Sequence, residues 1–199
     1  MQLTKGKFIV FHGINNLGKS TQAKLLVERI QKDGRQAMYL KYPLYDLEPS
    51  GPLLNEYLRK SNPYALTPRE AQMLFALNRT QFEPVLSQEY LARGVTVVAE
   101  DYTCTGIAWG VGAGVDRAFL ARVNCHLLRE NISFLFDGER FTAAKEAGHA
   151  HESDDVLTER VRLVHSELAK EFGWHLIGAN EPIETIHQKI WGIVQPRLS

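Results

Sequence analysis

Residues 13 to 20 combine residue types and a spacing that suit phosphate binding. The segment reads Gly13, four further residues, then Gly18, Lys19 and Ser20. It follows an apolar stretch of strand length and precedes a stretch with a helical pattern. Strand, glycine-rich loop and helix in this order indicate a P-loop, in which backbone N–H groups and a helix N-terminus point at an anion. A simple glycine turn before a helix is the alternative, and the flanking pattern argues against it.

The P-loop pattern predicts a role for its polar residues. Lys19 is expected to reach the terminal phosphates of a nucleotide, and the Ser20 hydroxyl to hold Mg²⁺. Glycine at two positions lets the backbone turn tightly and approach the ligand closely. The residues expected to bind the nucleotide here are Gly13, Asn15, Asn16, Gly18, Lys19, Ser20 and Thr21.

Composition limits the classes of partner and compartment. The chain has 199 residues, enough for a single domain spanning 1–199, and its 23 acidic and 23 basic residues balance. Neither a nucleic-acid polymer nor an anionic membrane is expected as partner, because both favour a basic excess. Two cysteines, Cys104 and Cys125, make no disulfide framework and suit the cytoplasm. A secretory signal and a membrane span are not expected, because the apolar runs are too short.

Strand-like apolar runs alternate with helical patterns along the chain. This alternation predicts an α/β fold of the P-loop NTPase type, with a doubly wound, five-stranded parallel sheet covered by helices on both faces. Ligands are then expected at the carboxyl ends of the strands. The predicted strands are 7–12, 37–42, 95–99, 132–136 and 174–177, and the predicted helices are 19–32, 52–60, 68–92, 117–129, 154–171 and 182–195.

Several element boundaries have a physical signature. Thr67, Pro68 and Glu70 form the pattern of a capping box with proline at the first helical position, so a helix is expected to begin there. Pro84 is expected to kink or split that helix, because proline removes a backbone hydrogen bond. Segment 43–52 contains three prolines and a glycine and is predicted to be a structured loop.

A P-loop alone indicates only that a nucleotide is bound. The Asp-x-x-Gly and Asn-Lys-x-Asp motifs that many GTPases carry do not occur in this chain. A motor or transporter ATPase usually needs partner domains, for which 199 residues leave no room. A small chain built around a P-loop is therefore interpreted as a kinase of small metabolites.

The chain resembles the thymidylate kinase family, P-loop enzymes that move a phosphoryl group from ATP to dTMP. The likeness covers most of the chain and depends on several motifs in a fixed order. The segments that carry it are 11–22, 42–46, 53–58, 74–79, 97–102 and 105–109. The resemblance implies ATP and Mg²⁺ as cofactors, a small nucleotide as substrate, and a homodimer.

The resemblance also implies a site for the acceptor nucleoside. Phe75 matches the family position whose ring stacks on thymine, and Arg79 matches the arginine that hydrogen-bonds the base. Their i, i+4 spacing places both on one helix face. Trp109 matches an aromatic residue near the deoxyribose, where a bulky ring can exclude a 2′-hydroxyl. A core phenylalanine, a solvated arginine and a core tryptophan are the alternatives.

Further roles follow from the same resemblance. Glu100 aligns with an acid that ends the third strand, faces the P-loop and can bind Mg²⁺, directly or through water. A surface carboxylate at a strand end is the alternative. Tyr42, Asp101 and Tyr102 fall in motifs that bind substrate. The residues implied to lie beside the adenine of ATP are Asn180 and Pro182.

Four positions depart from the family pattern. Asp101 replaces the arginine that grips the acceptor phosphate, and the stretch 44–46 lacks a cation that often follows the proline. Asn15 replaces an aspartate in the P-loop, and His12 replaces a glutamate before it. His12 is interpreted as a hydrogen-bonded structural residue rather than a ligand contact. The candidates to replace the missing cations are Lys41, Arg59 and Arg69.

A lid is expected over roughly residues 137–155. Family members carry arginines there that close over the transferring phosphoryl group, and electrostatic clamping needs one or two cations besides Lys19 and Mg²⁺. The cations available are Arg140, Lys145 and Arg160. Arg140 and Lys145 are the predicted catalytic pair.

The sequence leads to three hypotheses about function. The first is phosphorylation of dTMP by ATP. The second is a kinase for a pyrimidine nucleoside or a modified deoxynucleotide, in which Asp101 or Glu100 acts as base toward a hydroxyl. The third is a nucleotide-binding protein that has lost catalysis, which the few arginines of the lid suggest and the retained P-loop and base-binding residues oppose.

Overall fold

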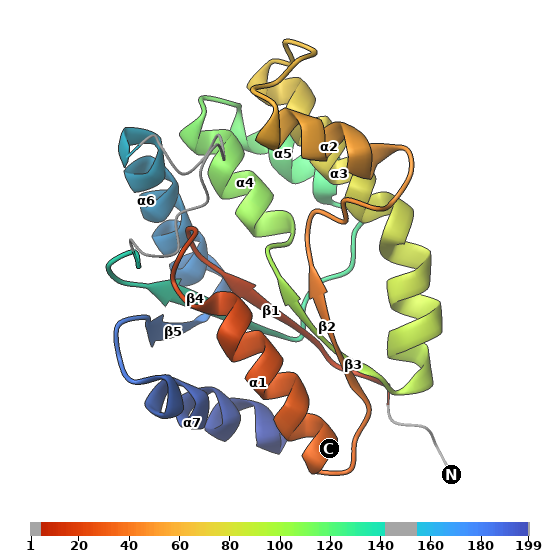
Figure 1. Ribbon diagram of the computed structural model, residues 1–199, viewed down its shortest axis with the longest axis vertical. Helices are drawn as coiled ribbons and strands as arrows, with labels where there is room; N and C mark the ends of the chain where they lie inside the picture. Colours follow the sequence, from red (N-terminus) through yellow and green to blue (C-terminus); the bar gives the residue numbers. More distant parts are fainter. Residues whose placement is uncertain (1–4, 142–154, 199) are drawn as a thin grey trace.

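The computed structural model describes residues 5–141 and 155–198. Its centre is a parallel sheet of five strands in the order β2-β3-β1-β4-β5 (Figure 1). The doubly wound parallel sheet that the sequence predicts is confirmed. The strands are β1 Phe8–His12, β2 Ala37–Lys41, β3 Thr96–Glu100, β4 Ile132–Asp137 and β5 His175–Gly178.

Strand β1 contributes side chains to both faces of the sheet. Ile9 and Phe11 join one buried cluster, and Phe8 and Val10 join another. All five residues of β1 and of β3 are buried, including the polar His12, Thr96 and Glu100. The apolar runs within both strands predict burial in a sheet covered on both sides. Side chains that alternate between faces thus give one strand two cores.

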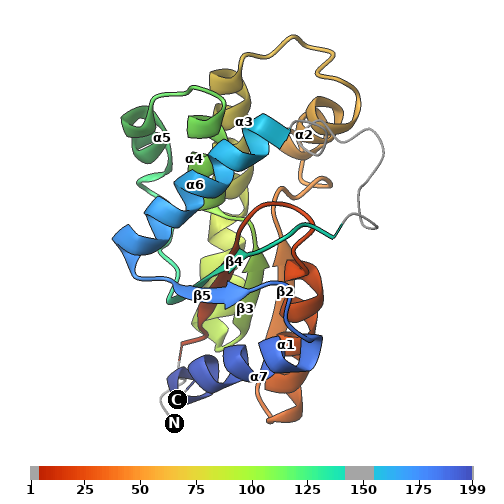
Figure 2. The ribbon, with the colours of Figure 1, turned by 90° about the vertical axis from the view of Figure 1, so that its left-hand side faces the viewer.

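The helices lie around this sheet in two groups (Figures 1 and 2). The helices α1 and α7 contact each other at one side of the sheet, whereas α4 contacts α3, α5 and α6 beyond the carboxyl ends of the strands. The α-helices are α1 Lys19–Lys32, α2 Ser50–Arg59, α3 Pro68–Pro84, α4 Thr103–Gly112, α5 Arg117–Asn124, α6 Asp155–Phe172 and α7 Ile183–Val194.

The parallel register brings the chemistry-bearing residues to one edge. Glu100, the last residue of β3, pairs with Phe11 of β1 on one side and with Lys41 of β2 on the other. The loop that follows His12 therefore begins beside the end of β3. The carboxyl ends of β1, β2 and β3 meet where a ligand is expected.

The sequence missed helix α4 altogether. Its ten residues include three glycines and two threonines, a composition with low helix propensity. Tertiary packing supplies the missing stability and also explains the glycines. A Cβ on Gly110 would lie 2.6 Å from Leu120, and one on Gly112 would lie 2.7 Å from Val161. Close approach of neighbouring helices requires glycine here.

Helix α3 begins as the sequence predicts and ends earlier. Thr67 caps it: its hydroxyl accepts from the Glu70 backbone N–H at 3.3 Å, and the Glu70 side chain accepts from the Thr67 backbone N–H at 2.8 Å. The α-helix ends at Pro84, which confirms the prediction that this proline kinks or splits the helical stretch 68–92. A π-helical turn Val85–Tyr90 and a 3₁₀ turn Leu91–Arg93 continue the path.

Two other boundaries differ slightly from prediction. Helix α5 ends at Asn124, five residues before the predicted end. Helix α2 begins at Ser50, inside the segment predicted to be a loop. A further 3₁₀ turn, Gln195–Arg197, follows α7.

No helix in the part of the chain that the structure describes has both the length and the apolar composition that crossing a bilayer requires.

Candidate active site

The loop between β1 and α1 requires glycine at both of its ends. Gly13 has φ 133°, and a Cβ there would lie 2.5 Å from the carbonyl oxygen of Phe136. Gly18, the residue before α1, has φ 77°. Neither position suits a side chain, because positive φ is unfavourable for other residues and the first site has no space. The loop is thereby held close against the end of β4.

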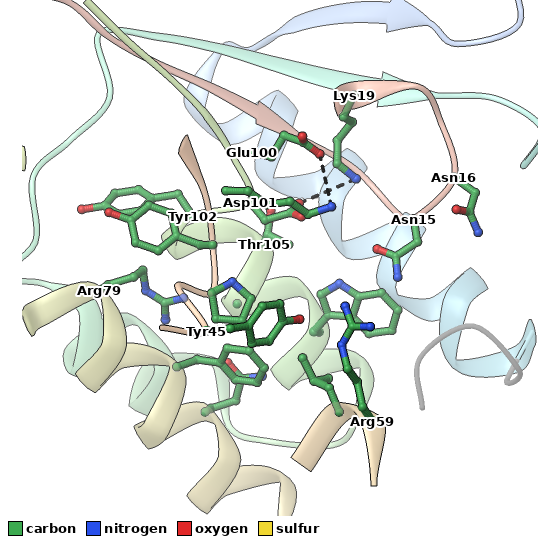
Figure 3. A pocket seen from close by; sticks show the side chains of 18 residues that line it. Asn15, Asn16, Lys19, Tyr45, Arg59, Arg79, Glu100, Asp101, Tyr102 and Thr105 are labelled. Atoms are coloured by element: carbon green, nitrogen blue, oxygen red, sulfur yellow. Dashed lines mark ion pairs between the residues drawn. The ribbon is translucent and has the colours of Figure 1, made fainter. Parts of the chain in front are cut away.

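Lys19 is buried at the start of α1 and points back into this loop. Its Nζ donates to the carbonyl oxygens of Gly13 at 2.9 Å and Ile14 at 2.7 Å. The same nitrogen lies 3.7 Å from Oδ1 of Asp101 (Figure 3). The ammonium group therefore sits inside the turn that the P-loop pattern assigns to phosphates.

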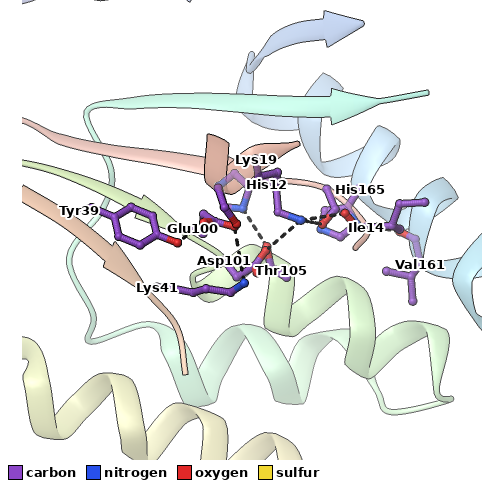
Figure 4. A network of polar contacts seen from close by, with 12 residues as sticks. His12, Ile14, Lys19, Tyr39, Lys41, Glu100, Asp101, Thr105, Val161 and His165 are labelled. Atoms are coloured by element: carbon purple, nitrogen blue, oxygen red, sulfur yellow. Dashed lines mark hydrogen bonds and ion pairs between the residues drawn. The ribbon is translucent and has the colours of Figure 1, made fainter. Parts of the chain in front are cut away.

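Glu100 forms the centre of a polar network beside Lys19. Its side chain is 2% exposed and accepts from the Ser20 hydroxyl at 2.9 Å and from the Tyr39 hydroxyl. Lys41 Nζ lies 3.9 Å from the same carboxylate (Figure 4). Burial and the hydrogen bond to Glu100 raise the pKa of Tyr39, so it stays a donor at neutral pH. Tyr39 was missed by the sequence reasoning, since nothing in β2 marks it apart from a strand residue.

The pair of oxygen groups on Ser20 and Glu100 fits a Mg²⁺ site. Both present the oxygen ligands that this ion prefers, and they adjoin the P-loop. No cluster of three or more His, Cys, Asp or Glu side chains that could hold a metal occurs within residues 5–141 and 155–198. Mg²⁺ that is bound together with phosphates typically takes only one or two carboxylates from the protein.

Asp101 follows Glu100 and has an unusual backbone and environment. Its φ is 57°, rare for a residue with a side chain, and its side chain is 20% exposed. Its Oδ1 is buried and accepts no hydrogen bond from any described residue. Burial raises the pKa of this carboxyl group, and the Lys19 ammonium opposes that shift. Asp101 thus combines an unfavourable backbone angle with a carboxylate oxygen that lacks a hydrogen bond, and it lies beside Lys19 of the P-loop.

A cavity of about 280 Å³ extends from the P-loop toward α3 and α4 (Figure 3). It brings together residues from five separate segments of the chain. Among its lining residues are the predicted site residues Asn15, Asn16, Lys19, Tyr42, Phe75, Arg79, Glu100, Asp101, Tyr102 and Trp109. Lining residues that the sequence reasoning did not select are Pro43, Tyr45, Leu58, Gln72, Thr105 and Gly106.

Phe75 and Arg79 both reach this cavity from α3. Arg79 is 3% exposed, and its Nε and Nη2 donate to Oδ1 of Asn124 at 3.2 and 2.9 Å. Burial lowers the pKa of Arg79 to about 10, which still leaves the guanidinium charged at neutral pH. The ring of Phe75 meets that of Tyr57 edge-on, with centroids 6.3 Å apart. Both residues of this pair therefore line the same cavity as Lys19.

The three candidate replacement cations differ in whether they line the cavity. Lys41 and Arg59 line the cavity. Arg69 does not, because its guanidinium stacks on the ring of Phe119 at 3.8 Å. Arg59 lies over the ring of Tyr45, 5.4 Å from its centroid. Two of the three candidate cations, Lys41 and Arg59, therefore line the same cavity as Asp101.

The described part of the lid begins beside the P-loop. The backbone N–H of Phe141 donates to the Asn16 carbonyl oxygen at 2.9 Å. Arg140 is not among the cavity-lining residues, and its Nη1 lies 3.4 Å from Oδ1 of Asp155. Lys145 falls outside the described residues, so no placement tests its predicted role.

The predicted adenine-side residues lie at the turn between β5 and α7. The Asn180 side chain accepts from the Glu139 backbone N–H at 2.7 Å and donates to its carbonyl oxygen at 2.9 Å. Pro182 precedes the first residue of α7. Neither residue lines the cavity described above. Asn180 thus ties this turn to the segment that follows β4, two strands away from β3.

His12 is a buried structural residue, as expected. Its Nδ1 lies 3.1 Å from the Thr105 hydroxyl, and its Nε2 lies 3.4 Å from Glu130. Its ring stacks on Trp174 with centroids 4.0 Å apart. The side chain is fully buried behind the P-loop and does not line the cavity.

A P-loop on a parallel sheet, with an adjoining cavity and a buried acid at the end of β3, defines a nucleotide-binding phosphotransferase. The family model for thymidylate kinase matches residues 11–190. The chain belongs to the thymidylate kinase family, and it is an enzyme that transfers a phosphoryl group.

Thymidylate kinases from several organisms are similar to this chain over almost its whole length. A thymidylate kinase of Homo sapiens is 28% identical over 195 residues, which cover 96% of this chain and 90% of that protein. A probable thymidylate kinase of Methanocaldococcus jannaschii is 29% identical over 193 residues, covering 94% and 95%. The solved thymidylate kinase structure from Candida albicans has a TM-score of 0.79 at 20% identity and covers 97% of this chain and 92% of that one, so it shows the shared fold.

Proposed function

We propose that this enzyme transfers the γ-phosphoryl group of ATP to dTMP, forming ADP and dTDP. One observation carries the proposal: a single cavity joins Lys19 of the P-loop to Phe75 and Arg79 on α3. A phosphate oxygen of the acceptor attacks the γ-phosphorus in line, and ADP leaves. A phosphate dianion is already nucleophilic, so alignment and charge neutralisation are the tasks left to the protein.

The donor end holds ATP with the P-loop and Mg²⁺. The backbone N–H groups of residues 13–20 cradle the phosphates, and Lys19 leaves the two carbonyl oxygens it now contacts to neutralise the terminal phosphates. Ser20 and Glu100 hold the metal ion, whose charge offsets that of the phosphate oxygens. Thr21 on the first turn of α1 and the turn at Asn180 and Pro182 complete the nucleotide site.

The acceptor end holds the base and sugar between aromatic side chains. The Phe75 ring stacks on thymine, and Arg79 donates to a base carbonyl oxygen. Trp109 packs near the deoxyribose, while Tyr42 and Tyr102 line the inner wall. Lys41 and Arg59 bind the acceptor phosphate in place of the missing arginine, because they are the two candidate cations that face the cavity.

Other parts of the proposal depend on membership of the family. Arg140 and Lys145, in the lid over residues 137–155, close over the transferring phosphoryl group and exclude water. The chain works as a single domain and pairs as a homodimer in the cytoplasm.

Asp101 favours a second candidate, a pyrimidine nucleoside kinase. Its carboxylate lies at the junction of the cavity and the P-loop, with Oδ1 unsatisfied among the described residues and a raised pKa. In this reaction, Asp101 takes the proton of a deoxyribose 5′-hydroxyl as its oxygen attacks the γ-phosphorus, and ADP leaves. A negative side chain suits a neutral hydroxyl better than a phosphate dianion.

A coupled assay of ADP release with ATP and Mg²⁺ separates these candidates. The acceptors are dTMP, thymidine, the other common nucleosides and their monophosphates, each at matched concentration. The proposal requires dTMP to give the highest kcat/KM. Preferential turnover of thymidine would replace it with the nucleoside kinase, and failure of every acceptor to stimulate ADP release would indicate a protein without catalysis.

A further inference from the structure

Gln72 is a buried polar residue of the cavity that neither the P-loop nor the base-stacking pattern explains. It precedes Phe75 by three positions and Arg79 by seven, so the three side chains share one face of α3. Its side chain is 7% exposed and lines the cavity. Its Oε1 is buried and has no hydrogen-bond partner among residues 5–141 and 155–198.

Gly106 of α4 lies beside both this oxygen and the guanidinium group of Arg79. A Cβ on Gly106 would lie 3.3 Å from Gln72 Oε1, 3.1 Å from Arg79 Nη2 and 3.2 Å from Arg79 Nη1. An acceptor oxygen and a donor guanidinium therefore border the same opening. Asn124 holds the guanidinium through Nε and Nη2, which leaves Nη1 outside that contact.

The donor of Arg79 and the acceptor of Gln72 are complementary to one edge of an oxopyrimidine base. Thymine and uracil present a carbonyl acceptor, O4, beside an N–H donor, N3–H. Cytosine presents the reverse, an amino donor beside a ring-nitrogen acceptor. With the Gln72 amide oriented as in the structure, its Oε1 toward the opening, a donor from Arg79 beside an acceptor from Gln72 matches the first edge and opposes the second at both positions.

We infer that Gln72 is a specificity-determining residue that accepts a hydrogen bond from N3–H of a 4-oxopyrimidine while Arg79 donates to O4. The inference rests on the proposed function in one respect, since it requires the acceptor base to lie over Phe75. It does not depend on whether the acceptor is a monophosphate or a nucleoside. A buried oxygen left unpaired by the wrong base makes that base bind poorly.

The test compares two ligands that differ only at the edge in question, dTMP and 5-methyl-dCMP. Titration calorimetry gives Kd for both with the wild-type protein and with Gln72→Met. Methionine keeps the aliphatic contact with α4, where the Gln72 Cγ lies 3.1 Å from a Cβ position on Gly110, and removes the amide. We expect the wild type to prefer dTMP, and the variant to lose about tenfold or more of dTMP affinity while 5-methyl-dCMP changes little.

Phe75→Leu is the matched control on the same helix face. A stacking ring does not distinguish the two edges, so this variant should weaken both ligands alike and leave their Kd ratio unchanged. Gly106→Ala is an independent second variant, because its methyl group would enter the opening between Gln72 and Arg79. It should weaken dTMP more than 5-methyl-dCMP, and it decides the question if Gln72→Met proves unfolded.

Measurements of ligand binding test the role of Gln72, whereas the assay of ADP release tests the proposed function. Selective dTMP binding without ADP release would end the dTMP kinase proposal and leave the role of Gln72 intact. An unchanged Kd ratio in folded Gln72→Met, or wild-type binding of neither ligand, would overturn the role of Gln72. Repeating the titrations with thymidine and 5-methyldeoxycytidine applies the same criterion to a nucleoside acceptor.

Discussion

The donor and acceptor ends of the active site differ in how their polar groups are satisfied. At the donor end, Lys19, Ser20 and Glu100 all have hydrogen-bond partners in the structure. At the acceptor end, the Tyr42 hydroxyl, Gln72 Oε1 and Asp101 Oδ1 are buried without a hydrogen-bond partner among the described residues. Buried polar atoms of this kind are costly unless a ligand satisfies them. Asn16 Nδ2 of the P-loop is also buried without such a partner, so the donor end is more fully satisfied within the chain than the acceptor end, but not completely.

The same contrast appears in the departures from the family pattern. The P-loop changes are mild, since Asn15 retains hydrogen-bonding capacity and His12 is buried behind the loop. The acceptor-phosphate region instead exchanges an arginine for Asp101, which reverses the charge. ATP binding is therefore expected to resemble that of other P-loop kinases, while acceptor binding is where this enzyme differs.

The largest effect is expected at the donor end. Lys19→Ala removes the ammonium group inside the P-loop, and we expect kcat to fall by about 10²- to 10³-fold, the loss typical of one preorganised donor to a developing charge. Circular dichroism and the thermal midpoint should confirm that the variant is folded. Near-normal turnover would show that the loop does not position the transferred phosphate.

At the acceptor end, Phe75→Ala should act through substrate affinity. Loss of base stacking is worth about 1–3 kcal/mol, so KM for the acceptor should rise by roughly tenfold or more. The KM for ATP should stay unchanged, because Phe75 belongs to α3 and is not part of the P-loop. A rise in both KM values would instead indicate a general distortion of α3.

Asp101 offers a sharper comparison of the two candidate reactions. Asp101→Asn removes a negative charge from the place where an acceptor phosphate approaches, so KM for dTMP should fall by roughly fivefold, about 1 kcal/mol of like-charge repulsion. The kcat for dTMP should change little. If the enzyme is instead a nucleoside kinase with Asp101 as base, the same variant would lose turnover of thymidine.

The smallest effect is on stability, and its pH dependence has a definite sign. Burial raises the pKa of Asp101 above its unfolded value, so stability is lost as pH rises from the unfolded pKa through the folded pKa, and the full cost of the ionised form is present above it. Asp101→Asn should therefore raise the thermal midpoint at pH 7 by about 2–4 °C for about 1 kcal/mol. Asparagine also tolerates the positive φ of this residue.

This gain should shrink as pH falls toward the unfolded pKa of aspartate, about 3.9, because the wild-type carboxyl group is then neutral in both states. Scanning calorimetry of the two proteins between pH 7 and pH 4 measures the difference. If the rise in thermal midpoint stays constant with pH, its cause is the backbone conformation of this residue and not the charge.

The sequence predicted most elements because their signals are local. The buried strands are continuous apolar runs, and the start of α3 has a capping box whose residues lie within one turn. Helix α4 was missed because its stability depends on packing against α6 and α5, which residues 103–112 do not show by themselves.

The sequence by itself determined the phosphate-binding loop of this protein. The motif from Gly13 to Ser20 lies within one short stretch of chain, so neighbouring residues alone carry its signal. The backbone angles of Gly13 and Gly18 agree with it, and the fold adds the close contact of Gly13 with the Phe136 carbonyl oxygen. Only the tertiary structure decided the acceptor end, including the choice of Lys41 and Arg59 over Arg69 and the position of Gln72. That end is assembled from side chains of segments far apart in the sequence, and which of them face one cavity depends on how the helices pack.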